Sequence, residues 1–461
     1  MLRKNEDIEL EITDITNEGN GVGRYDGVAV FVSGTAVGDV IKCRIVKVNK
    51  SYCYGIITGF LKKSAYRIDD DCAVSKTCGG CSFRHFTYEQ ECELKNNFVK
   101  ASFERIGKLH PVYEDFVGCD RISHYRNKAQ YPVGVLDGKA VCGFYAKRSH
   151  RICPQTHCSL QPECFADIVV FVMEYVNRNN IQAYDEQTGK GLLRHIYLRR
   201  GEHSDEIMLC LVVTSIHRSV CFDGLISAVT ERFTEIKSIV LNENPDNTNI
   251  ILGKKTVTVF GSDTINDKMC GNVVAISPQS FYQVNTLQAE KLYTIAKQYA
   301  QLDNDSVLLD LYCGAGTIGL SMCIGIKKLI GVEIIPQAIE NAKINARHNG
   351  IDNAEFICGD AGKIAKILYE RGERPNVIVA DPARTGCDRQ SLEYMAKMQP
   401  DRIVMISCNH ATAARDCAIL AELGYNPVKV RGVDLFPRTT HVECVVLLTK
   451  CMPLSGSDIA K

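Results

Sequence analysis

Residues 306–317 read SVLLDLYCGAGT, an apolar run that passes through an aspartate into a glycine-rich turn. A turn of this kind between a strand and a helix lets a ligand approach the backbone closely. The next apolar run, KLIGVE, ends at Glu333, where an acid can bind the two hydroxyl groups of a ribose. Residues 314–319 also fit the G-x-G-x-x-G spacing of a dinucleotide site, so the spacing alone predicts a nucleoside ligand without identifying it.

Apolar strands alternate with helical segments from about residue 281 onward. This alternation predicts a doubly wound parallel sheet, as in Rossmann-like domains. We expect the domain to span residues 277–453 and to be followed by a tail at 454–461. Its strand-like runs after Glu333 are EFICGD, VIVADPAR, RIVMISCN and ECVVLL.

Three further motifs lie at strand ends of this domain. Asp381 opens the motif DPARTG, Cys408 follows the strand RIVMI, and Glu443 lies where the last strand begins. Side chains that follow parallel strands point into the ligand crevice. With Asp310 upstream, these motifs favour S-adenosylmethionine as the ligand. The absence of a D/N-P-P-Y/F motif and of a Pro-Cys pair argues against an adenine or cytosine methyltransferase.

A polar and aromatic segment, SPQSFYQVN, lies ahead of the first helix of this domain at residues 277–285. Tyr282 can stack on an aromatic ligand and Gln283 can hydrogen-bond to it. A packed linker between strand and helix is the alternative.

Residues 1–67 alternate between short strands and glycine-rich turns, which predicts a small β-barrel. Residues 40–67 contain seven Lys or Arg residues and no acid, with Tyr52 and Tyr54 among them. Basic groups interleaved with aromatic ones suit a face that follows a nucleic-acid backbone, and a solvated face is the alternative. This stretch resembles a TRAM domain, an RNA-binding module.

A central, β-rich, RNA-binding domain is expected at residues 68–276. Thr87-Tyr-Glu-Gln is a capping-box pattern and predicts a helix over 88–107 that can pack on the catalytic domain. Residues 112–280 then read as short strands with few strong helices. Basic stretches at 121–151 and 192–201 support RNA binding by this domain.

The chain has 22 cysteines, most of them in apolar runs that indicate small buried side chains in a reducing compartment. Cys72-x5-Cys78-x2-Cys81 is different, because glycines between ligands let a loop wrap around a metal centre. A fourth ligand would come from Cys153, Cys158 or Cys164. Four thiolates suit zinc and an iron–sulfur cluster alike, and three unligated cysteines are the remaining alternative. The x5 gap argues against a radical-SAM enzyme.

In chain order, SFYQVN, DLYCGAG, GVE, DPARTG, ISCN and DLFPRTTHVE resemble the RNA uracil-C5 methyltransferase family. The TRAM-like start and the cysteine motif extend the resemblance to nearly the whole chain. It implies that Cys408 is the nucleophile and Glu443 the general base. The same resemblance implies a cofactor site that is lined by Gln283, Tyr312, Glu333 and Asp381. It also implies a 4Fe–4S cluster that is bound by Cys72, Cys78, Cys81 and Cys158.

The chemistry of uracil explains why a thiol and a carboxylate are needed. Uracil C5 is too weak a nucleophile to take a methyl group directly, but a thiolate that adds to C6 turns C5 into an enolate-like carbon. A base must then remove the proton from C5. The resemblance implies a uridine in structured RNA as the substrate, in 23S rRNA or, as the alternative, in tRNA.

Composition sets the limits of these expectations. Lys plus Arg and Asp plus Glu both number 54, which excludes a uniformly basic nucleic-acid binder but not a local basic face. The apolar stretch FADIVVFVMEYV carries two acids and falls short of the ~20 residues of a membrane span. We expect a cytoplasmic monomer without membrane association. The competing hypothesis is a non-catalytic RNA-binding or redox-sensing iron–sulfur protein.

Overall fold

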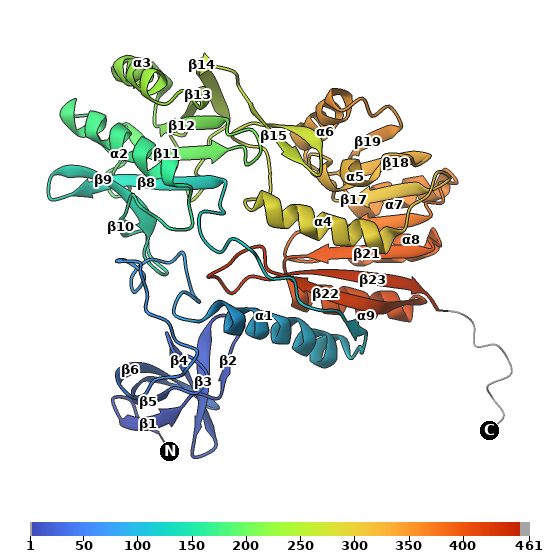
Figure 1. Cartoon of the computed structure of the whole chain (residues 1–461), viewed down its shortest axis with the longest axis horizontal. Coiled ribbons are helices and arrows are strands. Elements are labelled where there is room, and N and C mark those ends of the chain that lie inside the picture. Colours follow the sequence, from blue (N-terminus) through green and yellow to red (C-terminus); the bar gives the residue numbers. More distant parts are fainter. Residues whose placement is uncertain (1, 452–461) are drawn as a thin grey trace.

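The computed structural model describes residues 2–451, so the expected tail at 454–461 lies outside the described residues. The chain forms three regions, and Figure 1 shows the N-terminal region in blue, the middle region mainly in green and the C-terminal region in yellow to red. Helix α1 runs beneath the C-terminal region although it belongs to the N-terminal quarter of the sequence.

The N-terminal sheet curls around its own apolar core. Its strand order is β1-β5-β6-β4-β3-β2, and alternate residues such as Ile41 and Cys43 point inward. Gly23 allows β3 to close on β1, because an added Cβ would lie 2.4 Å from the carbonyl oxygen of Glu11. The strands are β1 (Asp7–Glu11), β2 (Asp14–Ile15), β3 (Asn20–Tyr25), β4 (Val28–Ser33), β5 (Val40–Val48) and β6 (Tyr52–Lys62).

The middle region is a mixed seven-stranded sheet, β10-β9-β8-β11-β12-β13-β14, with α2 and α3 on one face. The sequence predicts few strong helices here, but Phe165, Val169, Val172 and Val176 recur at helical spacing and are buried against the sheet. Two helices that were not expected therefore cover one face of a region that consists mainly of strands. Its elements are β8 (Lys128–Leu136), β9 (Lys139–Tyr145), β10 (Ile152–Pro154), α2 (Glu163–Arg178), β11 (Leu193–Arg200), β12 (Ile207–Val213), η2 (Ile216–Phe222), α3 (Asp223–Arg232), β13 (Ile236–Glu243) and β14 (Lys255–Gly261).

The C-terminal region is an eight-stranded sheet in the order β19-β18-β17-β20-β21-β23-β22-β7. Strands β17 to β21 are parallel, and the chain order reverses beside β17, where a ligand crevice is expected. Its elements are α4 (Thr286–Ala300), β17 (Val307–Leu311), α5 (Thr317–Met322), β18 (Lys328–Glu333), α6 (Pro336–His348), β19 (Ala354–Cys358), α7 (Ala361–Glu370), β20 (Val377–Ala380), α8 (Arg389–Lys397), β21 (Arg402–Ser407), α9 (His410–Glu422), β22 (Tyr425–Val433) and β23 (Glu443–Lys450).

A segment from the first quarter of the chain packs into this C-terminal region. Helix α1 (Tyr88–Ser102) begins at Thr87, whose hydroxyl accepts a hydrogen bond from the Gln90 N–H as in the expected capping box. Val99 and Phe103 lie in the core of the C-terminal sheet. The chain continues through the π-helical turn η1 (Phe103–Gly107) into β7 (Val112–Tyr113), which pairs with β22.

The middle and C-terminal regions also share one apolar core. Tyr197 and Met208 from the middle sheet lie in the same buried cluster as Leu308 on β17. The hairpin formed by β15 (Ile265–Met269) and β16 (Asn272–Ile276) contributes to that cluster from between the two sheets. Among residues 2–451, no helix has the length and apolar character needed to cross a membrane.

Candidate active site

Cys408 and Glu443 are brought together by the pairing of β21 with β23. Ser407 lies opposite Cys444 in this antiparallel pair, so one further step along the register places Cys408 across from Glu443. The Cys408 side chain is half-buried, and Glu443 is 5% exposed. A thiol that solvent can reach thus lies beside a carboxylate that solvent barely reaches.

Asp381 and Arg384 supply the charges around this pair. Burial and the nearby Asp381 raise the pKa of Glu443 to about 8, and burial raises the pKa of Asp381 to about 7. Burial, Glu443 and Asp381 also raise the pKa of the Cys408 thiol. The Arg384 guanidinium lowers both the Cys408 and the Glu443 pKa, although less than burial raises them.

Arg384 also holds a histidine that the sequence analysis did not single out as a site residue. Its guanidinium donates to Nδ1 of His441 over 2.9 Å, so that nitrogen acts as the acceptor. Burial and the charge of Arg384 lower the pKa of His441 to about 4, which keeps the ring neutral. Asn409 donates to the Arg384 carbonyl oxygen at 2.9 Å and so fixes the DPAR backbone beside Cys408.

Helix α1 anchors the loop that precedes Glu443. The Lys95 ammonium donates to Glu91 at 2.7 Å and to Asp434 at 2.8 Å, and all three side chains are fully buried. Tyr88 donates to the second carboxylate oxygen of Asp434 at 2.8 Å, and Glu91 accepts the backbone N–H of Arg438 at 2.7 Å. These bonds position the segment 434–438, a few residues ahead of His441 and Glu443.

The glycine-rich turn lies at the carboxyl end of β17. Asp310 is 1% exposed and accepts the Gly319 N–H at 2.9 Å, which ties the strand to α5. Glu333, at the end of β18, accepts the backbone N–H of Gly314 at 3.2 Å. Tyr312 has a φ of 68° and donates to Ser391 at 3.2 Å. The turn therefore connects the ends of β17 and β18 with helices α5 and α8, through Asp310 and through Tyr312 and Glu333, which were expected at the cofactor site.

Gln283 and Tyr282 have different surroundings. The Tyr293 hydroxyl hydrogen-bonds to Thr317 at 3.5 Å, and Gln283 and Asp381 lie close enough to affect the pKa of Tyr293, so Gln283 lies near the glycine-rich turn. Tyr282 is 2% exposed and donates to Asp267 at 2.9 Å. The possibility that Tyr282 stacks on a ligand is therefore wrong, because its ring is part of the protein core.

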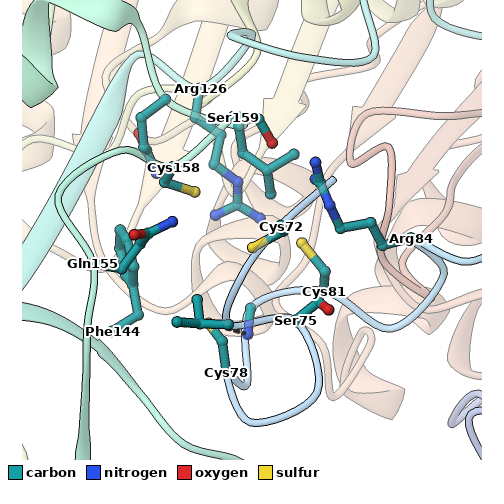
Figure 2. Close-up of a pocket in the computed structure, with 14 residues that line it drawn as sticks. Cys72, Ser75, Cys78, Cys81, Arg84, Arg126, Phe144, Gln155, Cys158 and Ser159 are labelled. Atoms are coloured by element: carbon teal, nitrogen blue, oxygen red, sulfur yellow. Dashed lines mark hydrogen bonds between the residues drawn. The ribbon is translucent and has the colours of Figure 1, made fainter. Parts of the chain in front are cut away.

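Four cysteines gather at a second place in the fold. Cys72, Cys78, Cys81 and Cys158 line one cavity of about 80 Å³, and Figure 2 shows the Cys72, Cys81 and Cys158 sulfur atoms around a common space. Arg84 and Arg126 also line this cavity, and in the view of Figure 2 the Arg126 guanidinium is drawn between the sulfur atoms of Cys158 and Cys72.

The two other candidate ligands lie outside that cavity. Cys153 is buried and its thiol donates to Thr77 at 3.5 Å, whereas Cys164 lies in the first turn of α2. Of the three candidates for a fourth ligand, the structure brings Cys158 to the cysteine motif. Within residues 2–451, no three His, Cys, Asp or Glu side chains are grouped closely enough to hold one metal ion.

Comparisons with known proteins identify the family of this chain. Residues 246–451 match the tRNA (Uracil-5-)-methyltransferase family, and residues 2–58 match the TRAM domain. A protein of Oceanobacillus iheyensis described as an uncharacterized RNA methyltransferase is 42% identical over 450 residues, with 97% of each chain covered. The chain belongs to the RNA uracil-C5 methyltransferase family. A second RNA methyltransferase, from Clostridium tetani, is 40% identical over 448 residues and 97% of each chain.

The fold of this methyltransferase is also that of a solved structure. The tRNA (uracil-54, C5)-methyltransferase of Pyrococcus abyssi, in complex with S-adenosyl-L-homocysteine, superposes with a TM-score of 0.77. The similarity covers 96% of this chain and 100% of that chain at 22% sequence identity. The expected TRAM barrel and the methyltransferase fold are thereby confirmed.

Two features of the site lay beyond the sequence reasoning. Arg384 was part of a recognised motif, but nothing local showed that it would hold His441, 57 residues further on. The buried group around Lys95 had one local signal, the i,i+4 spacing of Glu91 and Lys95 on a helix. The third member of this group, Asp434, lies 339 residues after Lys95 in the sequence.

Proposed function

We propose that this methyltransferase forms 5-methyluridine in structured RNA, with 23S rRNA as the substrate, and that it acts as a monomer in the cytoplasm. The observation that carries the proposal is the pairing of Cys408 with Glu443 across β21 and β23. A uridine in a folded RNA must leave its stack to reach a thiol in such a crevice. The Pyrococcus abyssi similarity makes tRNA the alternative substrate.

Cys408 performs the first step of the proposed reaction. Its thiolate adds to C6 of uracil, and the electrons of the C5–C6 double bond move to form an enolate. Thiol ionisation is favoured by Arg384, whose positive charge lowers the pKa of Cys408. C5 then attacks the sulfonium methyl group of S-adenosylmethionine, and S-adenosylhomocysteine leaves.

Glu443 performs the last step. It removes the proton from the methylated C5, the C5–C6 double bond re-forms, and the Cys408 thiolate departs. Its raised pKa places it in the range where a carboxylate is a stronger base than usual. Gln283, Tyr312, Glu333 and Asp381 are proposed to hold S-adenosylmethionine at the carboxyl ends of β17, β18 and β20.

We also propose that Cys72, Cys78, Cys81 and Cys158 hold a 4Fe–4S cluster. Zinc would need its four sulfur ligands within roughly 4 Å of one another, at a Zn–S distance of ~2.3 Å. The thiols instead surround a cavity, which suits ligands to different atoms of one larger group. A backbone N–H from Gly80 reaches the Cys78 sulfur at 3.4 Å, and Nε of Arg126 is buried without a partner. These donors suit an anionic group, which would stabilise the loop.

Trapped intermediates test the catalytic roles. Cys408→Ala should give neither methyl transfer nor a covalent RNA adduct, because C5 is never activated. Glu443→Gln should accumulate a methylated protein–RNA adduct that survives denaturing electrophoresis, because the C5 proton stays in place. Cys221→Ala, at an exposed cysteine on η2, is the matched control and should react as the wild type does. Normal turnover by Cys408→Ala would overturn the mechanism.

Mapping of modified nucleosides tests the substrate. In a strain that lacks this protein, we expect 5-methyluridine to disappear from a position in 23S rRNA while tRNA retains its own. Loss from tRNA alone would assign the alternative substrate. Loss from neither RNA would contradict the proposed function itself.

A further inference from the structure

A groove of about 610 Å³ lies between the TRAM barrel and the middle region, and Cys408 is not among the residues that line it. The barrel contributes Tyr54, and the end of β9 and the turn after it contribute Tyr145, Lys147 and Arg148. The cysteine loop, residues 72–82, contributes Gly79 and Ser82. Its walls therefore come from three segments that are distant in sequence.

Tyr54 belongs to a patch of aromatic rings on the outer face of the barrel. Phe31 on β4 and Tyr52 and Tyr54 on β6 lie with ring centroids 5.6 to 5.8 Å apart. All three are half-buried, and the residues between them, such as Val32 and Cys53, point into the core. A small barrel does not need three rings outside its core for stability, whereas rings on such a face can stack on nucleic-acid bases.

The opposite wall carries unpaired positive charge. In the described part of the chain neither Lys147 nor Arg148 pairs with an acid, whereas the neighbouring His150 pairs with Glu186 at 2.8 Å. Both basic side chains are exposed along the groove. Glu18 also lines it, so the groove is not uniformly basic, and the aromatic and basic groups together suit a single strand of RNA.

The groove adjoins the catalytic loop. Ser82 donates its backbone N–H to the carbonyl oxygen of Arg438 at 2.9 Å, in the segment that leads to Glu443. Next to Glu18, a Cβ added at Gly19 would lie 3.1 Å from the Thr440 side chain. An RNA strand bound in the groove would therefore run toward the site where Cys408 and Glu443 lie.

We propose that this groove binds an unpaired segment of the substrate RNA beside the target uridine. Bases stack on Tyr54 and Tyr145, and phosphates lie against Lys147 and Arg148. The inference rests on the proposed function and adds where the flanking strand is held. One wall is set by the cysteine loop, because Gly79 donates to the Tyr145 carbonyl oxygen at 2.9 Å and Lys147 donates to that of Thr77 at 3.2 Å.

Binding measurements with two RNA probes test the groove. The probes are a fluorescein-labelled oligouridylate of roughly 12 nucleotides, within the site size of a small barrel, and a hairpin that has a short loop and no other unpaired segment. Tyr54→Leu with Tyr145→Leu should weaken binding of the oligouridylate roughly 5-fold or more for each stacked base. Lys147→Gln with Arg148→Gln should lower the slope of log affinity against log salt by about 1.4, the value for two phosphates of a single strand.

Matched variants and the hairpin decide the outcome. Tyr66→Leu, at an exposed tyrosine outside the groove, and Lys363→Gln with Lys366→Gln on α7 should bind both probes as the wild type does. S-adenosylmethionine affinity, unchanged in every variant, shows that the fold is intact. If the groove variants bind the oligouridylate with wild-type affinity, the inference is overturned. If they lose as much affinity for the hairpin as for the oligouridylate, the surface binds duplex RNA instead. These binding measurements do not depend on methyl transfer, so a negative result for the groove can be distinguished from a failure of the proposed function.

Discussion

At the scale of single residues, the active site holds carboxylates that resist ionisation. Burial and Asp381 raise the pKa of Glu443 to about 8, against an ordinary value of 4.5. A carboxyl whose pKa rises on folding binds its proton more tightly in the native state. The associated stability is fully present below pH 4.5 and is lost as the pH rises through about 8.

This linkage predicts the stability of Glu443→Gln. The glutamine cannot ionise, so the variant should gain thermal stability relative to the wild type as the pH rises from 4.5 to about 8, by a few degrees at the upper end. Thermal melts at a series of pH values measure the difference. A difference in melting temperature that stays constant over this range would show that Glu443 does not carry the raised pKa.

Arg384 is expected to act on the nucleophile and on His441 together. Arg384→Gln should slow formation of the covalent adduct with 5-fluorouridine RNA by roughly 10- to 100-fold, the effect of losing a hydrogen bond to a charged group. The pH at which the adduct forms at half its maximal rate should also rise, because Arg384 lowers the Cys408 pKa. Arg389→Gln on α8, which removes an exposed pair with Glu393, is the control. An unshifted pH profile in Arg384→Gln would exclude this role.

At the scale of elements, the loop that carries three clustered cysteines should depend on its ligand. Anaerobically purified protein should contain about four iron and four sulfide per chain. Cys81→Ser and Cys158→Ser should lose the brown chromophore, whereas Cys153→Ser, outside the cavity, should keep it. Iron analysis and the visible spectrum measure this. Stoichiometric zinc without iron in the wild-type protein would overturn the assignment of an iron–sulfur cluster.

An element could be predicted from the sequence where the residues that indicate it lie close together in the chain. The strands around Asp310, Asp381 and Cys408 were predictable, because apolar runs and their terminal motifs lie within a few residues of one another. Helix α2 was not foreseen, because the run FADIVVFVMEYV is nearly continuous in apolar residues and its helical spacing is hard to see. The choice of Cys158 over Cys153 came from family resemblance, since spacing alone does not show which thiol the fold brings near Cys81.

At the scale of the whole molecule, the TRAM barrel and the catalytic region are not independent. Phe83, Phe86 and Phe98, which lie before and on α1, pack into the core of the barrel. Deletion of the barrel would expose these rings. Two members of the basic run 40–67 have structural partners, since Arg44 pairs with Asp7 and Arg67 with the buried Asp39. The lysines of that run are therefore the better test of RNA binding.

Neutralising exposed barrel lysines should weaken RNA binding without unfolding the barrel. Lys42→Gln, Lys62→Gln and Lys63→Gln together should lower the slope of log affinity against log salt by up to about 2, if each lysine neutralises one phosphate. S-adenosylmethionine affinity should not change. Lys363→Gln with Lys366→Gln, far away on α7, controls for net charge. A slope equal to that of the wild type would contradict the basic-face interpretation.

The insertion of α1 and β7 into the C-terminal sheet has a consequence for how the chain is made. During synthesis, domains generally fold as units from the N-terminus. Here, Lys95 meets Asp434 and β7 meets β22 only after almost the whole sequence has been translated. A chain that stops before residue 434 would bury a lysine without one of its two acids. In the newly made chain, α1 must therefore remain unpacked or bound to a chaperone until the last strands emerge from the ribosome.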